Sequence, residues 1–231
     1  MTLVAPRTTQ GFELIGNLMQ VVDNGSEWEI TPSLALKQGD AVVLTAGKVA
    51  KAAAGATNIL GVMAEAVTAH ATTKTMGRVY THPYNVYRVS FVDHFDGTAT
   101  GGTTTTLVAQ LPVHDTDDDW NGALLYVYAG TNKGQERIIS DYAHGTDTLT
   151  WTEPMPAACD TTTKFIILGE GDEAGASVIH RGTVGINLKN EYSVDANAAV
   201  DAVDGPCAAL NIYPADLMMD VVFIKHRLAS R

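Results

Sequence analysis

Short apolar runs separated by glycine-containing turns fill residues 36–67, and this pattern limits what the chain can fold into. The pair Gly39-Asp40 is a turn signal before the apolar residues 41–44, and Gly47 reverses the chain into Val49. After an alanine-rich link, residues 59–62 predict another strand, with a glycine where two backbones can approach closely. Short strands joined by tight turns are typical of a small antiparallel β-barrel or sandwich, so we predict a mainly β fold.

The composition fits one large β domain or two small ones. The chain has 231 residues, of which 45% are hydrophobic and 18% charged, so it can bury a core and is globular rather than disordered. Many of its polar residues are Thr, Ser, Asn and Gly, which suit strands and turns better than helices.

The charge balance argues against nucleic acid as a partner. The formal net charge is -11, whereas binding to phosphates needs clustered Lys and Arg. The acidic residues are scattered, so solubility explains them. We expect no secretory signal, because no basic region precedes an apolar run at the amino terminus. No apolar run approaches the roughly 20 residues that cross a bilayer, so we also expect no membrane partner.

The two cysteines, Cys159 and Cys207, lie far apart in the sequence and match neither a disulfide framework nor a paired zinc motif. Two reduced thiols in a protein made in a cytosol are the simpler interpretation. Whether the two pair with each other stays open.

The first half of the chain predicts an arm, an ambiguous segment and several strands. Residues 1–10 are small and polar and are expected to form an arm or tail. Residues 11–22 are apolar without a clear period, so they fit helix or strand equally. Residues 23–26 form a turn, and strands are expected around Trp28 and Ile30, at residues 77–80 and at residues 86–92.

The middle of the chain predicts a separate unit. Residues 96–106 are rich in Gly and Thr and mark a boundary as a flexible or edge-strand segment. Short strands are then expected at residues 123–128, 135–139, 149–152 and 165–168, which together predict a small β-meander. Residues 169–175 read as a linker, so we define residues 94–170 as an inserted module.

The chain then returns to its first domain, which we predict from residues 1–93 and 171–231. Residues 177–180 and 182–188 resume strand character, and residues 221–224 form a last buried strand. Residues 193–203 predict one short helix, because Ser193 can cap it, alanine dominates it and Gly205-Pro206 ends it.

A search for reactive groups gives no catalytic, cofactor-binding or metal site. The histidines are scattered, without an HxxxH or HxH pair, and no GxSxG nucleophile elbow is present. The acidic run from Asp115 to Asp119 fails the EF-hand pattern, because Trp120 stands where the glycine belongs and Tyr126 where the glutamate belongs. A looser calcium site on Asp115, Asp117 and Asp119 stays open beside a solvated acidic turn.

Two further patterns are weak signals for a ligand. Residues 169–175 are glycine-rich but carry Glu170, Asp172 and Glu173, which would repel phosphate. Aromatic residues in strands more often form core than a sugar-binding face. The residues in question are Trp28, Trp120, Trp151, Tyr126, Tyr128 and Tyr142. We therefore expect no enzyme activity and no cofactor.

The strand and turn pattern of residues 31–92 resembles the head decoration (cement) proteins of tailed bacteriophages. The matching features are QGD-AVVL, AGKV, a run of alanines and NILGV. The resemblance implies a β-barrel that docks on the capsid exterior, a homotrimer, and the major capsid protein lattice as partner. It also implies a virion location after synthesis in the host cytoplasm.

Residues 118–168 resemble a β-module found in phage virion proteins. The matched positions are Asn121, Gly122, Gly130, Gly134, Gln135, Arg137, Ile139 and Tyr142. Glycines there allow chain reversal, and Arg137 is expected to bond turn carbonyls or an acidic residue such as Asp141. The roles expected for these matched residues are structural.

Three functions remain under consideration. The leading one is a structural virion protein that decorates and stabilises the outer surface of a bacteriophage capsid. The alternative is a tail- or fibre-associated module that binds the host or a glycan, which would need aromatic rings exposed together. The third is an enzyme whose site assembles across strands, which would need a pocket with convergent His and carboxylates.

Overall fold

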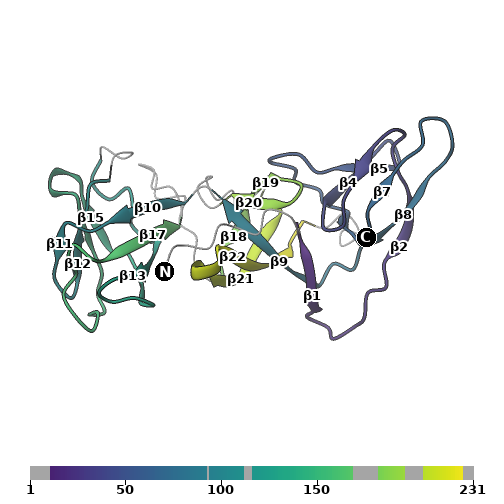
Figure 1. Cartoon of the computed structure of the whole chain (residues 1–231). Coiled ribbons are helices and arrows are strands. Elements are labelled where there is room, and N and C mark those ends of the chain that lie inside the picture. Colours follow the sequence, from purple (N-terminus) through teal and green to yellow (C-terminus); the bar gives the residue numbers. More distant parts are fainter. Residues whose placement is uncertain (1–10, 93, 112–115, 169–181, 196–204, 226–231) are drawn as a thin grey trace.

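The computed structural model describes residues 11–92, 94–111, 116–168, 182–195 and 205–225. The structure is mainly β, as the sequence predicts: apart from the short 3₁₀ turns η1 (His144–Thr146) and η2 (Pro214–Asp216), every described element is a strand. Figure 1 shows the strands in three groups along an elongated molecule, with the module at one end. The expected arm and the linker at residues 169–175 lie outside the described residues.

The central group is a nearly closed, barrel-like sheet. Its order is β18-β21-β22-β9-β20-β19, and β1 also pairs with β9. Because β18 and β19 are separated by Asn187 alone, the two ends of the sheet meet. The strands are β1 (Glu13–Asn17), β9 (Asn85–Val92), β18 (Val184–Ile186), β19 (Leu188–Asn190), β20 (Ser193–Asp195), β21 (Cys207–Tyr213) and β22 (Met218–Phe223).

Strand β9 organises this barrel. Its alternate residues Asn85, Tyr87, Val89 and Phe91 are buried, which is the period of two that a strand imposes. On one edge it pairs with β22, and on the other it pairs first with β1 and then with β20. The barrel core therefore forms around β9, the strand that the sequence predicts at residues 86–92.

The stretch at residues 36–67 builds most of a second, five-stranded sheet of order β2-β8-β6-β4-β5. Gly61 lies where backbones approach, as expected, since a Cβ there would sit 1.9 Å from the carbonyl oxygen of Tyr80. The strands are β2 (Ser26–Glu29), β4 (Ala41–Thr45), β5 (Lys48–Lys51), β6 (Gly61–Met63) and β8 (Met76–Tyr80), with a small pair of β3 (Ala35–Leu36) and β7 (Val67–Thr68) beside them.

The module contains two four-stranded sheets, and its strands pair only with one another within the described residues. One has the order β10-β17-β13-β14, made of β10 (Phe95–Thr98), β17 (Lys164–Leu168), β13 (Leu124–Ala129) and β14 (Glu136–Ile138). The other has the order β11-β12-β16-β15, made of β11 (Gly101–Gly102), β12 (Thr106–Val108), β16 (Thr148–Thr150) and β15 (Asp141–Ala143).

This pairing corrects the simple meander that the sequence predicted. All four expected strands are present, but β16 joins β12 and β15 in a sheet separate from β13, β14 and β17. The reason is that residues 101–108 and 141–143 supply further strands, and β16 finds its partners there. The segment at residues 96–106 does provide edge strands, since β10 lies at one edge of the first sheet and β11 at one edge of the second.

The predicted helix at residues 193–203 is wrong at its start. Ser193, expected as the cap, begins strand β20, which runs parallel to β9 from Ser90 to Val92. Pairing with β9 outweighs the local helix preference of this segment, because the backbone N–H and C=O groups along the edge of β9 need partners, and a strand supplies them whereas a helix does not. Residues 196–203 lie outside the described residues.

Candidate docking surface

The loop after β1 exposes a run of apolar side chains. Relative exposure is between 41 and 79% for five residues of this loop and of the adjoining strand, which we call the apolar tip: Ile15, Leu18, Met19, Val21 and Val22. Tyr84, in the turn before β9, is also half exposed. Single exposed apolar residues are common, but a contiguous group of this kind marks an interaction site.

Asn17 fixes the start of the tip. Its carboxamide oxygen accepts the backbone N–H of Met19 at 2.8 Å, and its carbonyl accepts that of Gln20 at 2.9 Å. The N–H of Leu18 bonds the carbonyl of Tyr84 at 2.9 Å. Gln20 has a φ of 57°, in the left-handed region. These bonds hold the tip in one conformation even though its side chains face water.

Asp23 fixes the end of the tip. Its carboxylate accepts the backbone N–H of Gly25 at 2.8 Å and that of His82 at 2.9 Å. It also accepts the side-chain amide of Asn85 at 2.8 Å. Burial alone would raise the pKa of Asp23, but these hydrogen bonds outweigh burial and lower the pKa below its ordinary value. The carboxylate is therefore held in its charged form.

One buried amide connects the two ends. Asn85 is 1% exposed, and while it donates to Asp23 its oxygen accepts the side-chain amide of Asn17 at 2.9 Å. The same Asn17 amide lies 2.8 Å from Nδ1 of His82. Because Asn85 belongs to β9, the tip is anchored directly to the central strand of the barrel.

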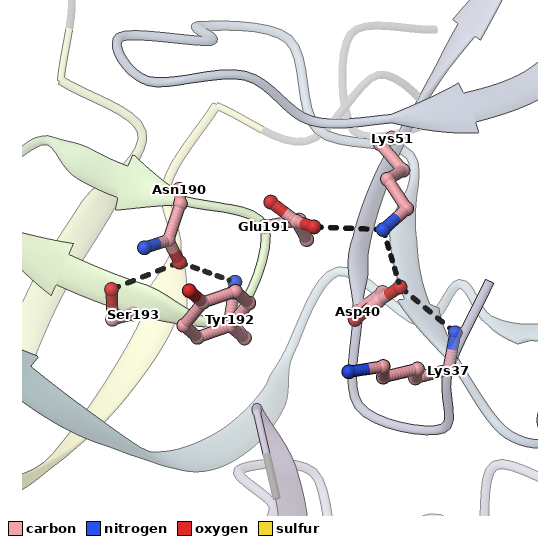
Figure 2. A network of polar contacts seen from close by, with 7 residues as sticks. All are labelled: Lys37, Asp40, Lys51, Asn190, Glu191, Tyr192 and Ser193. Carbon is pink, nitrogen blue, oxygen red and sulfur yellow. Dashed lines mark hydrogen bonds and ion pairs between the residues drawn. The ribbon is translucent and has the colours of Figure 1, made fainter. Parts of the chain in front are cut away.

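An ion-pair network joins the five-stranded sheet to the barrel. Figure 2 shows the Lys51 ammonium between two carboxylates, 2.8 Å from Glu191 and 3.6 Å from Asp40. Asp40 is almost fully buried, and burial raises its pKa despite the N–H of Lys37 and the charge of Lys51. The N–H of Ala41 also donates to the carbonyl of Glu191 at 2.6 Å. The role of this network is to fix the position of the two sheets.

A second network lies on the barrel surface near β1. Arg88 donates from Nε and Nη2 to the two carboxylate oxygens of Asp220, at 2.8 and 3.2 Å. The Tyr213 hydroxyl donates to the same carboxylate at 2.8 Å, and the guanidinium carbon of Arg88 lies 4.5 Å from the centre of the tyrosine ring. All three groups are engaged with one another, so the cluster is structural.

The module has an apolar depression of about 640 Å³. Its lining is Leu124, Glu136, Arg137, Ile138, Ile139, Ser140, Trp151, Thr152 and Glu153. The guanidinium of Arg137 donates to the carbonyls of Glu153 and Pro154, each at 2.7 Å. The expectation that Arg137 bonds turn carbonyls is thus confirmed.

A hollow of about 500 Å³ lies beside β1, lined by Phe12, Glu13, Leu14, Lys37, Gln38, Gly39, Met63 and Tyr80. Neither this hollow nor the depression has a histidine in its lining. The convergent His and carboxylates that an enzyme site needs are therefore not found in these two places.

The described carboxylates of the acidic run accept hydrogen bonds from groups of the module. Asp117 accepts the N–H of His144 at 2.8 Å, and Asp118 accepts the amide of Asn121 at 2.7 Å. Asp119 accepts the N–H of Thr116 at 3.4 Å, and Asp115 lies outside the described residues. Within the described ranges no three His, Cys, Asp or Glu side chains gather in a metal-binding group.

The aromatic residues proposed for a sugar-binding face do not gather on the surface. Trp120, Tyr142 and Trp151 are buried in the module core. Tyr126 and Tyr128 are half-buried and pack toward the barrel core, on the opposite side of β13. The exposed aromatic face that would support a glycan-binding module is absent from these positions.

Both cysteines are free and buried in different cores, Cys159 in the module and Cys207 in the barrel. Burial raises the pKa of each thiol, which keeps both protonated and unreactive.

Sequence reasoning missed the apolar tip. The sequence of residues 11–22 fits helix and strand equally, whereas the structure makes residues 13–17 a strand and residues 18–22 an exposed loop. The available signal is an uncharged and mostly apolar run, Leu18 to Val22, that follows an asparagine and precedes an aspartate, two residues that fix turns through their side chains.

Comparison of the chain with family models, curated proteins and solved structures finds no match. No helix in the described part of the chain is long and apolar enough to cross a membrane.

Proposed function

We propose that the chain is a structural virion protein that decorates and stabilises the outer surface of a bacteriophage capsid. It binds the major capsid protein lattice non-covalently as an oligomer, and the oligomer is a homotrimer. It is made in the host cytoplasm, its place is the capsid exterior, and it carries out no catalysis. The basis is the resemblance of residues 31–92 to decoration proteins, together with one structural observation.

That observation is the apolar tip. A surface that exposes five apolar side chains would weaken solubility unless another protein covers it. Hydrogen bonds at both ends of the tip fix its backbone in one conformation before any partner binds. A preorganised surface loses little conformational entropy when it docks, so more of the contact energy is kept as affinity. This is what an assembly protein needs.

The rigid connection between the sheets supports the same proposal. Lys51 ties the five-stranded sheet to the barrel, and Leu124, Ile166 and Leu168 of the module belong to the barrel core. A protein that binds the assembled lattice and not its free subunits stabilises that lattice by mass action. It does so best when its contact surfaces keep a fixed spacing.

Co-sedimentation with empty, expanded heads of the phage that encodes the chain tests this function. We expect saturable binding to the heads and a higher temperature of head disruption when the sites are full. Heads that have not expanded are the control, and we expect weaker binding to them. A protein that stays in the supernatant with expanded heads would contradict the proposal.

The alternative, a tail or fibre module that binds a glycan, has less support. Its expected feature was a set of rings exposed on one face, whereas Trp151 is buried and Tyr128 bonds Asp96 through its hydroxyl at 2.8 Å.

A further inference from the structure

We infer that Asn24 is a site of spontaneous chemical modification, at which the side-chain amide is lost through a cyclic imide formed with the backbone nitrogen of Gly25. The inference goes beyond the proposed function and does not depend on it, because the reaction needs water and no partner. It concerns the same part of the molecule, since Asn24 follows Asp23, whose carboxylate fixes the end of the apolar tip.

The reaction starts at the backbone nitrogen that follows an asparagine. This nitrogen attacks the side-chain carbonyl carbon, the carbon–nitrogen bond of the side-chain amide breaks, and ammonia leaves with the proton that the backbone nitrogen gives up. Water then opens the imide ring at either of its two carbonyls, so the residue becomes aspartate or isoaspartate. Nothing is oxidised or reduced. A glycine in the next position hinders ring closure least, because it has no side chain.

The chain has two asparagine–glycine pairs, Asn24-Gly25 and Asn121-Gly122, and their surroundings differ. Asn24 is exposed, and its side chain makes no hydrogen bond within the described residues. The carboxamide of Asn24 is therefore free to turn toward the nitrogen of Gly25, ammonia can leave, and water can reach the ring.

The backbone N–H of Gly25 is already directed at a base. It donates to Oδ1 of Asp23 at 2.8 Å, in a turn in which an aspartate side chain bonds the N–H two residues further on. The hydrogen bonds from His82 and Asn85 hold this carboxylate in its charged form. A carboxylate can take up the proton of Gly25 as the nitrogen attacks and can pass it to the leaving amine.

The second pair is restrained at each of these points. The side-chain nitrogen of Asn121 donates to Oδ1 of Asp118 at 2.7 Å, and its side-chain oxygen is shielded from water. The N–H of Gly122 donates to the carbonyl of Ile139 at 2.6 Å, and a carbonyl oxygen is not a base at neutral pH. The imide can form at Asn121 only after these bonds open locally, so the fold protects Asn121 and leaves Asn24 reactive.

Modification of Asn24 changes how the tip is held. Isoaspartate places an additional methylene group in the main chain before Gly25, which moves the Gly25 N–H away from the carboxylate of Asp23. Both products also add a negative charge next to Asp23, and like charges repel each other. The end of the tip should therefore lose order once Asn24 has reacted.

The test incubates the purified protein at slightly alkaline pH and follows both asparagines in the same sample by peptide mapping with mass spectrometry. In the folded protein we expect Asn24 to be converted about tenfold faster than Asn121, which is the factor that the opening of one or two hydrogen bonds costs. In urea the contacts are lost, so the two rates should become similar. This second incubation separates the effect of the fold from the effect of the sequence.

Asn24→Gln is the matched variant, because glutamine keeps an amide at this exposed position but would have to form a larger ring. Amide hydrogen exchange is measured before and after the incubation. We expect faster exchange at residues 17–25 in the incubated wild type and unchanged exchange in the incubated variant. Thermal unfolding checks that the variant is folded.

Two results would overturn the inference: conversion of Asn121 as fast as that of Asn24 in the folded protein, or a folded protein in which Asn24 stays intact although it reacts in urea. Conversion of Asn24 without faster exchange at residues 17–25, or equally faster exchange in Asn24→Gln, would overturn the effect on the tip. Binding to expanded heads is measured separately, so none of these results can be mistaken for a failure of the proposed function.

Discussion

The side chain of Asn85 donates a hydrogen bond to the carboxylate of Asp23, 2.8 Å away, and this bond fixes the end of the apolar tip to the central strand of the barrel. The same amide accepts from Asn17 at the start of the tip. The loop is therefore exposed in its side chains and ordered in its backbone, a combination that suits a docking surface.

Substitution of Asn85 should loosen the tip. Asn85→Ala removes a buried amide, so Asp23, Asn17 and Tyr87 each lose the hydrogen bond that they make with it. We therefore expect the free energy of unfolding to fall by about 1–3 kcal/mol. Urea denaturation measures the loss, and amide hydrogen exchange should rise at residues 17–25. Asn121→Ala is the control, since the Asn121 amide donates to the nearby carboxylate of Asp118, and this substitution should change stability little. Unchanged exchange at residues 17–25 would show that Asn85 does not order the tip.

Lys51 should stabilise the connection between the sheets in a pH-dependent way. Lys51→Met leaves the buried Asp40 and Glu191 without a shared cation. We expect a loss of about 1–2 kcal/mol at neutral pH, less than for a fully buried pair because Lys51 is 35% exposed. Burial raises the pKa of Asp40, so this carboxyl takes up its proton at a higher pH than an ordinary aspartate does, and the loss should shrink in mild acid. Urea denaturation at neutral and acidic pH checks this, and a loss that grows in acid would contradict it.

Asp160 should make the module sensitive to strong acid. Hydrogen bonds from the Thr162 and Thr131 hydroxyls and from the Thr162 N–H lower the pKa of Asp160 from 3.8 to about 2. Because the pKa is lower in the folded state, the carboxylate stabilises the fold above pH 3.8, and this contribution is lost as the pH falls toward about 2. Asp160→Asn should flatten the acid dependence of stability in that window, as followed by circular dichroism. An acid titration that matches the wild type would rule out this role.

The thiols should be silent in the folded protein. Cys159 and Cys207 are both free and buried, so a disulfide-exchange reagent should react only slowly with the native protein. After denaturation the same reagent should react with both thiols. Absence of thiol reaction in denaturant without reductant would show that the two are paired.

The strands were predictable where local pattern decides them. The apolar runs at residues 41–44 and 86–92 become β4 and β9, because period-two burial and turn glycines are visible in the sequence. Ser193 misled because it suits a helix cap, whereas the edge of β9, about a hundred residues earlier in the chain, makes it part of a strand. Local propensity does not contain that information.

The candidate docking surface was harder to predict because it depends on distant residues. Asn17 and Asn85 are separated by 68 positions, and Lys51 and Glu191 by 140. No local pattern indicates that such side chains meet. Exposure of the run from Leu18 to Val22 also follows from the absence of a covering element in the described structure, which only the fold reveals.

The number of copies bound to each expanded head at saturation tests the central claim most directly. Quantified from head-bound protein across a titration, it should reach a plateau at a fixed number set by equivalent sites on the lattice. The heads should become more resistant to heat as that plateau is approached. No bound protein, or binding that rises without a plateau, would contradict a role in capsid decoration.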